Sequence, residues 1–129
     1  MSGLRIFKTR WFARFARKER LADANLAEAV LRASRGLIDA DLGGGLIKQR
    51  SARTGQGRSG GYRLLIAFRP SDRAVFMLGF AKSDRGNVTA DELESLKRAA
   101  ALWLSTDGVR IEKAIAEGVL VEVKYEKEK

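Results

Sequence analysis

Two apolar segments separated by a short turn occupy the middle of the chain and constrain its fold more than any other feature. Residues 62–69 read YRLLIAFR and residues 74–82 read AVFMLGFAK. Between them lie Pro70, Ser71 and Asp72, which are residue types common in turns. Two such segments joined by a short turn predict a β-hairpin. The second segment is almost wholly apolar, so we expect it to be central in a sheet or covered on both faces.

Segments with helical periodicity lie on both sides of this hairpin. Apolar residues at helical spacing predict one helix from Thr9 and a second over residues 23–36. A third helix is predicted from Thr89 to residue 104, because Thr89 and Glu92 form a capping-box pattern. We expect the aromatic side chains of the helical segments to lie in the core: Trp11, Phe12 and Trp103.

Shorter segments complete the predicted order. Strands are expected over residues 4–8 and 46–50, with a turn over residues 41–45. A short helix over residues 108–117 and a last strand over residues 119–124 follow the third long helix. The order β-α-α-β-β-β-α, with a small C-terminal α-β extension, predicts an α+β fold in which helices pack against a mainly antiparallel sheet.

The residue types that are missing narrow the possible chemistry. The sequence contains no cysteine and no histidine. Disulfides and thiolate metal sites are therefore excluded, as are the commonest general base and the usual zinc ligand. We expect no metal ion and no cofactor. No apolar run reaches the roughly 20 residues of a membrane span, and the first residues lack a signal-type apolar region, so we expect a cytoplasmic protein with no membrane contact.

Positive charge is concentrated in two parts of the chain. The whole sequence has 25 basic and 16 acidic residues, a net charge of +9. Residues 1–20 contain seven basic residues and one acidic residue, a net +6, and residues 42–85 contain nine and two, a net +7. An uneven distribution of this kind favours nucleic acid, an acidic protein or an anionic membrane as partner over a merely solvated surface.

The two central strands are expected to bring several of these cations together. Because side chains alternate between the two faces of a strand, Lys48 and Arg50 share one face of their strand. Arg63 lies at the start of the next strand, and Lys82 ends the one after it. We expect these four side chains to converge on one concave surface. For any isolated pair of them, a solvated strand face is the alternative.

The same region resembles the RelE/HigB-type toxins of the RelE/ParE superfamily. The similarity lies in a glycine-rich run, residues 55–63 (GQGRSGGYR), preceded by Lys48-Gln49-Arg50 and followed by Gly79-Phe80-Ala81-Lys82. It extends over residues 4–104, with residues 39–89 as its specific part. On this resemblance, residues 1–104 form a RelE-like toxin core, and residues 105–129 form an extension packed on the same single domain.

The resemblance implies a fold, an activity and partners. The fold is a twisted antiparallel sheet flanked by helices. RelE/HigB members are metal-independent endoribonucleases that cut messenger RNA in the ribosomal A site, whereas ParE members inhibit DNA gyrase. Both kinds are neutralised by a cognate antitoxin. The expected partners are therefore an antitoxin, mRNA and the ribosome with its rRNA, in a homodimer or a toxin–antitoxin hetero-oligomer.

Cleavage of RNA without a metal ion requires a base for the 2′-hydroxyl and cations for the phosphoryl oxygens. The predicted catalytic residues are Arg63, which would hold the phosphate, and Lys48 or Lys82, which would accept the proton. The predicted RNA-binding residues are Arg50, Arg53, Arg58 and Arg85.

The sequence also departs from the family pattern. Ser83 follows Lys82 where several members have arginine, and the only later tyrosine is Tyr125 in the tail. Either Arg85 substitutes for the C-terminal catalytic residue of the family, or the active site is incomplete. The alternative functions are a non-enzymatic toxin homologue, such as a ParE-like gyrase inhibitor, and a nucleic-acid-binding module.

Overall fold

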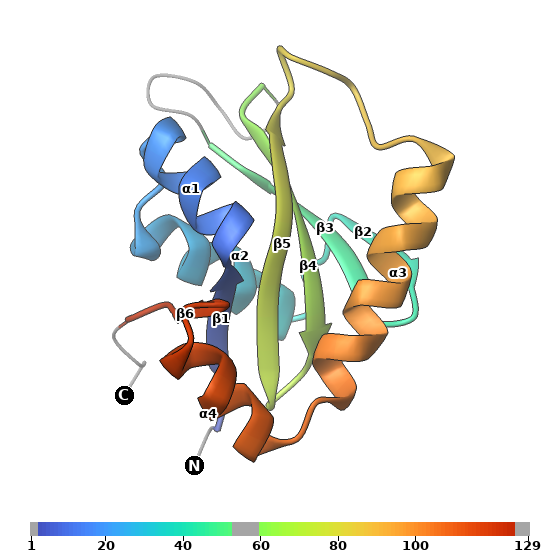
Figure 1. The fold of residues 1–129 in the computed structure, drawn as a ribbon. Coiled ribbons are helices and arrows are strands. Elements are labelled where there is room, and N and C mark those ends of the chain that lie inside the picture. The colour runs from blue at the N-terminus through green and yellow to red at the C-terminus, as the bar shows by residue number, and fades with distance from the viewer. Residues whose placement is uncertain (1–2, 53–59, 126–129) are drawn as a thin grey trace.

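The computed structural model describes residues 3–52 and 60–125, which form one mixed sheet with helices on both faces (Figure 1). The sheet has the strand order β2-β3-β4-β5-β1-β6. Neighbouring strands are antiparallel except β1 and β5, which run parallel. The predicted α+β fold with a mainly antiparallel sheet is confirmed. In chain order the elements are β1 (Arg5–Thr9), α1 (Arg10–Glu19), α2 (Asp23–Ser34), β2 (Ala40–Gly43), β3 (Leu46–Ser51), β4 (Tyr62–Arg69), β5 (Arg73–Ala81), α3 (Ala90–Ser105), α4 (Gly108–Ala116) and β6 (Leu120–Glu122).

The predicted hairpin is the centre of the sheet. β4 and β5 pair from Tyr62 opposite Ala81 to Arg69 opposite Arg73, with a register shift between Leu65 and Ile66. β5 lies between β4 and β1, which explains why its sequence is apolar on both faces.

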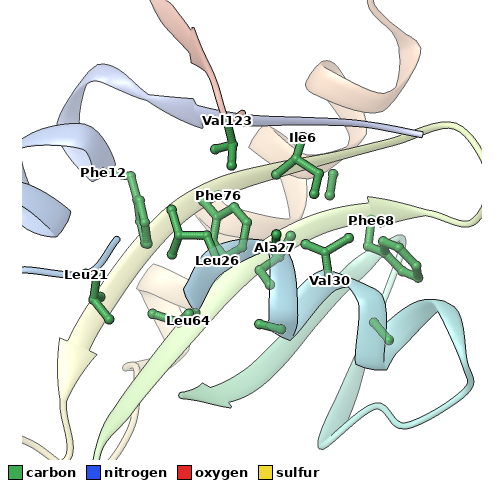
Figure 2. Packing of buried hydrophobic residues seen from close by; sticks show 14 of the residues in the cluster. Ile6, Phe12, Leu21, Leu26, Ala27, Val30, Leu64, Phe68, Phe76 and Val123 are labelled. Carbon is green, nitrogen blue, oxygen red and sulfur yellow. The ribbon is translucent and has the colours of Figure 1, made fainter. Parts of the chain in front are cut away.

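Each face of the sheet has its own core. On the face covered by α1 and α2, buried side chains from the helices meet alternate residues of β4 and β5, among them Phe12, Leu26, Leu64 and Phe76 (Figure 2). The opposite face, with Leu65 and Ala67 of β4, is covered by α3 and α4. α3 is amphipathic and begins at the predicted capping box, in which the Thr89 side chain accepts from the Glu92 amide.

Two features differ from the sequence-based prediction. β2 lies where only a turn was expected, because residues 40–43 pair with β3 before the glycine turn. Trp11 is 44% exposed instead of being part of the core, and it stacks on Phe15 with ring centroids 5.6 Å apart. For β1 the sequence predicted no partner strand, and it pairs in parallel with β5.

The C-terminal segment packs on the same sheet. β6 pairs antiparallel with β1 and so covers one of its edges. The Arg5 guanidinium donates to both carboxylate oxygens of Glu122, at 2.9 Å each, and to Glu112 at 2.6 Å. These hydrogen bonds raise the pKa of Arg5 and lower that of Glu122. Within the described ranges, none of the helices has the length and apolar character needed to cross a membrane.

Candidate functional site

A cationic pocket lies at the end of the sheet where β3, β4 and β5 meet the connection to α3. Its volume is about 280 Å³. Other hollows are larger, at 480 to 540 Å³, and one of them adjoins this pocket at Asp39 and Arg50. Volume alone does not identify a site, and this pocket joins all four cations expected to converge. Its lining residues are Asp39, Ala40, Lys48, Arg50, Arg63, Lys82 and Gly86.

Strand pairing explains why these side chains meet. Arg50 of β3 lies directly opposite Arg63 of β4, so both side chains leave the same face of the sheet. Lys48 is two residues before Arg50 and shares that face. The Lys82 amide donates to the Gly61 carbonyl at 2.8 Å, which continues the β4–β5 pairing beyond Ala81 and places Lys82 at the same end.

The connection from β5 to α3 closes the pocket on one side. The Lys48 Nζ donates to the Asn87 side-chain Oδ1 at 3.2 Å. A Cβ atom built on Gly86 would lie 3.8 Å from the Lys82 Nζ. Asn87 was not predicted as a site residue, because its position depends on how the connection folds back over β3.

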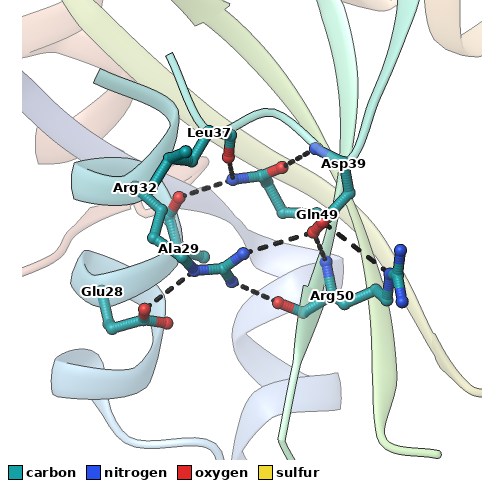
Figure 3. A network of polar contacts seen from close by, with 7 residues as sticks. All are labelled: Glu28, Ala29, Arg32, Leu37, Asp39, Gln49 and Arg50. Atoms are coloured by element: carbon teal, nitrogen blue, oxygen red, sulfur yellow. Dashed lines mark hydrogen bonds and ion pairs between the residues drawn. The ribbon is translucent and has the colours of Figure 1, made fainter. Parts of the chain in front are cut away.

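Asp39 stands on the pocket wall and binds two arginines (Figure 3). Its Oδ2 accepts the backbone N–H of Arg50 at 2.7 Å and a guanidinium N–H of Arg32 at 3.3 Å. Its Oδ1 lies 3.8 Å from the Arg50 Nε. Burial by itself would raise the pKa of Asp39, but the hydrogen bonds and the two positive charges outweigh burial and lower it. Asp39 is therefore ionised at neutral pH.

Arg32 is a buried cation with three acceptors, two carboxylates and one backbone carbonyl. Its side chain projects from α2 and is 9% exposed. The guanidinium donates to Glu28 at 2.8 Å, to Asp39, and to the backbone carbonyl of Arg50. A buried arginine needs such partners to offset the loss of hydration.

Gln49 joins the same network from the opposite side of β3. Its side chain is fully buried. The Oε1 accepts from the Asp39 amide at 2.7 Å, and the Nε2 donates to the carbonyls of Ala29 at 2.9 Å and Leu37 at 3.1 Å (Figure 3). Gln49 thus fixes β3 to α2 and to the segment that leads into β2. The sequence offered one sign of this arrangement, an amide at the inward-facing position between Lys48 and Arg50.

The electrostatics of the pocket favour an anion. Partial burial lowers the pKa of Arg63, and the positive charge of Arg50 lowers it further, while Asp39 acts in the opposite direction. Two guanidinium groups that disfavour each other's charge are stabilised when an anion binds between them. The arrangement can therefore bind a phosphate group.

Of the other predicted site residues, Arg85 is described by the structure and does not line this pocket. Arg85 donates to Glu92 at 2.8 Å and lies over the Phe80 ring, 4.8 Å from its centroid. The hydrogen bond from Arg85 and that from the Thr89 amide lower the pKa of Glu92. Arg53 and Arg58 fall outside the described residues.

Both tyrosines are engaged elsewhere in the fold. The Tyr62 hydroxyl donates to Glu19 at 3.0 Å under α1, and the Tyr62 ring is buried as expected from its strand position. The Tyr125 hydroxyl donates to the Leu4 carbonyl at 2.8 Å, where burial raises its pKa. Tyr125 therefore has no place in the cationic pocket.

Comparison with known proteins agrees with the fold. The family model described as "RelE toxin of RelE / RelB toxin-antitoxin system" matches residues 4–123. The match extends beyond residue 104 and includes α4 and β6. A search of curated proteins found no match to this chain. Because the family match spans nearly the whole chain, the protein belongs to the RelE toxin family of toxin–antitoxin systems.

Proposed function

We propose that this RelE-family toxin is a metal-independent endoribonuclease that cleaves mRNA bound to the ribosome. The observation that supports the proposal is the meeting of Lys48, Arg50, Arg63 and Lys82 around one pocket of about 280 Å³. A single phosphodiester is the substrate group that such a cluster recognises best, because several fixed cations can contact its oxygens at once.

The proposed reaction is attack by the RNA on its own backbone. Lys48 or Lys82, in its neutral form, accepts the proton of the 2′-hydroxyl. The 2′-oxygen then forms a bond to phosphorus while the bond to the 5′-oxygen breaks, which gives a 2′,3′-cyclic phosphate. The 5′-oxygen leaves with a proton supplied by the protonated lysine or by water. Arg63 and Arg50 stabilise the negative charge on the phosphoryl oxygens during this step.

Membership in a toxin–antitoxin family implies a cognate antitoxin as partner. The net charge of +9 suits an acidic antitoxin as well as RNA. We propose a toxin–antitoxin hetero-oligomer as the resting state, with a homodimer as the alternative.

One observation favours a second candidate, a toxin that acts without cleaving RNA, such as a gyrase inhibitor. In the described parts of the chain, neither tyrosine reaches the pocket and Arg85 is paired with Glu92. The cations that would bind the phosphate are therefore in place, but none of these three residues is available to protonate the leaving oxygen.

Induction of the toxin in a bacterial host distinguishes the two functions. We expect new mRNA 5′ ends with codon periodicity on translated messages, and plasmid supercoiling that does not change. Arg63→Ala should reduce cleavage by about 100-fold or more, since it removes a charge that acts on the transition state. Arg110→Ala is the matched control, because Arg110 lies on α4 with its side chain 79% exposed and outside the pocket.

Two results would contradict the proposal. Relaxed plasmids with intact messages would identify a gyrase inhibitor instead. Cleavage that persists in the Arg63→Ala variant would remove Arg63 from the reaction.

A further inference from the structure

Among the described residues that line the cationic pocket, Asp39 is the one with a carboxylate, and that carboxylate accepts the backbone N–H of Arg50. Arg50 and Arg63 face each other directly across β3 and β4. Like charges at directly opposed positions destabilise a strand pair. Without an opposing group, the two side chains would therefore point away from each other.

We propose that Asp39 is a positioning residue that holds Arg50 beside Arg63, so that both arginines reach the same phosphodiester. This inference rests on the proposed endoribonuclease function and adds to it a residue for which no role has been assigned.

The backbone of Arg50 supports this proposal. Its N–H donates to Asp39 at 2.7 Å, and its C=O accepts from Arg32. The pairing of β2 with β3 begins only at Ala40, opposite Lys48. Side chains from Asp39 and Arg32 therefore hold both polar backbone groups of Arg50, two residues beyond the last β2 pair.

The network also connects this position to the rest of the fold. Arg32 comes from α2, and Gln49 fixes the backbone of Asp39 from within the core. Asp39 is thus held by Arg32 of α2 and by Gln49 of β3, while its carboxylate holds Arg50, the next residue of β3. An arrangement of this kind limits the motion of the Arg50 backbone, which is what a group that must match a transition state requires.

Neutralising Asp39 distinguishes a positioning role from a purely electrostatic one. As a negative charge, Asp39 weakens the attraction of the pocket for phosphate, so its neutralisation alone should tighten RNA binding. As a positioning residue it favours cleavage, so its neutralisation should slow the chemical step. A purely electrostatic role therefore predicts tighter RNA binding when Asp39 is neutralised, whereas a positioning role predicts a lower kcat.

The test compares Asp39→Asn with Asp72→Asn. Each substitution removes one carboxylate that contacts two arginines, but Asp72 contacts Arg69 and Arg73 and lies outside the cationic pocket. Cleavage of ribosome-bound mRNA is measured in a reconstituted translation system, and binding is measured with a short RNA carrying 2′-O-methyl groups. We expect Asp39→Asn to lower kcat by about 10- to 100-fold, with unchanged or tighter RNA binding. Asp72→Asn should leave both quantities unchanged.

A double-mutant cycle tests whether Asp39 acts through Arg50. In an Arg50→Ala background, Asp39→Asn should cause no further fall in kcat, because the residue that it positions is gone. Equal falls in both backgrounds would overturn the inference. Thermal melts followed by circular dichroism verify that each variant is folded.

If Asp39→Asn does not fold, Asp39→Glu replaces it in the same cycle. Glutamate keeps the charge but moves the carboxylate by one methylene from the Arg50 amide, so kcat should still fall. An unchanged kcat in either folded variant would overturn the inference and leave the proposed function intact. If the unchanged protein cleaves no mRNA at all, the proposed function fails, and the inference fails with it.

Discussion

Gly79 shows how one residue without a side chain permits the packing of a whole helix. It lies in β5, under the aromatic residues of α1. A Cβ atom built at this position would lie 2.5 Å from the Phe15 Cε2 and 3.1 Å from the Phe12 Cε1. Phe15 cannot move away easily, because Trp11 stacks on it and Tyr62 meets it edge-on at 6.0 Å.

We therefore expect Gly79→Ala to lower the free energy of unfolding by about 1 to 3 kcal/mol, the usual effect of overpacking a core. Urea denaturation followed by circular dichroism measures this change. Gly108→Ala is the control, since nothing lies within 4 Å of a Cβ atom there. Equal stability of the Gly79→Ala variant and the unchanged protein would show that α1 can shift away from β5.

At the scale of single residues, alternation along a strand was enough to place Lys48, Arg50 and Arg63 on one face. The roles of Asp39 and Asn87 could not be predicted in the same way. Each binds its partner through a loop or strand end whose path depends on tertiary contacts. An aspartate beside a turn is ordinarily a solvated turn residue, and its sequence gives no sign of the arginine from α2 that it meets.

At the scale of elements, those with strong local sequence patterns were predicted, whereas the strand pairing that depends on distant contacts was not. The β4–β5 hairpin and α3 have strong local patterns, a short turn and a capping box, and both were predicted. β2 has four residues and two nearby glycines, so its pattern resembles a turn. The parallel pairing of β1 with β5 joins segments about 70 residues apart in the chain, a separation that no local pattern specifies.

β6 is a short element whose contribution to stability can be measured directly. Leu120 is 1% exposed and packs in the core on the α3 and α4 face of the sheet, whereas Val121, its neighbour, is 40% exposed. Leu120→Ala should lower the free energy of unfolding by about 2 to 5 kcal/mol, because it leaves a cavity.

The matched control for β6 is Val121→Ala, which should cost less than about 1 kcal/mol. Thermal or urea unfolding of the two variants provides the comparison. Similar small losses in both would mean that the C-terminal segment is only loosely attached to β1.

At the scale of the whole molecule, the sheet buries apolar side chains on both faces and collects cationic side chains at one end. Its two faces bury separate cores, and the end where β3, β4 and β5 meet the 82–89 connection gathers four cations of the basic central block. The family match over residues 4–123 identifies the molecule as a toxin with a cognate antitoxin. In the proposed function, these four cations together bind one phosphodiester of RNA.

An NMR titration of the protein with a short RNA blocked by 2′-O-methyl groups measures this binding residue by residue, since the chain of 14.3 kDa is small enough for full assignment. We expect the largest chemical-shift changes at Lys48, Arg50, Arg63 and Lys82, and an affinity that falls steeply as salt is added. Changes centred on α4 and β6, or binding that is insensitive to salt, would contradict RNA binding by these cations.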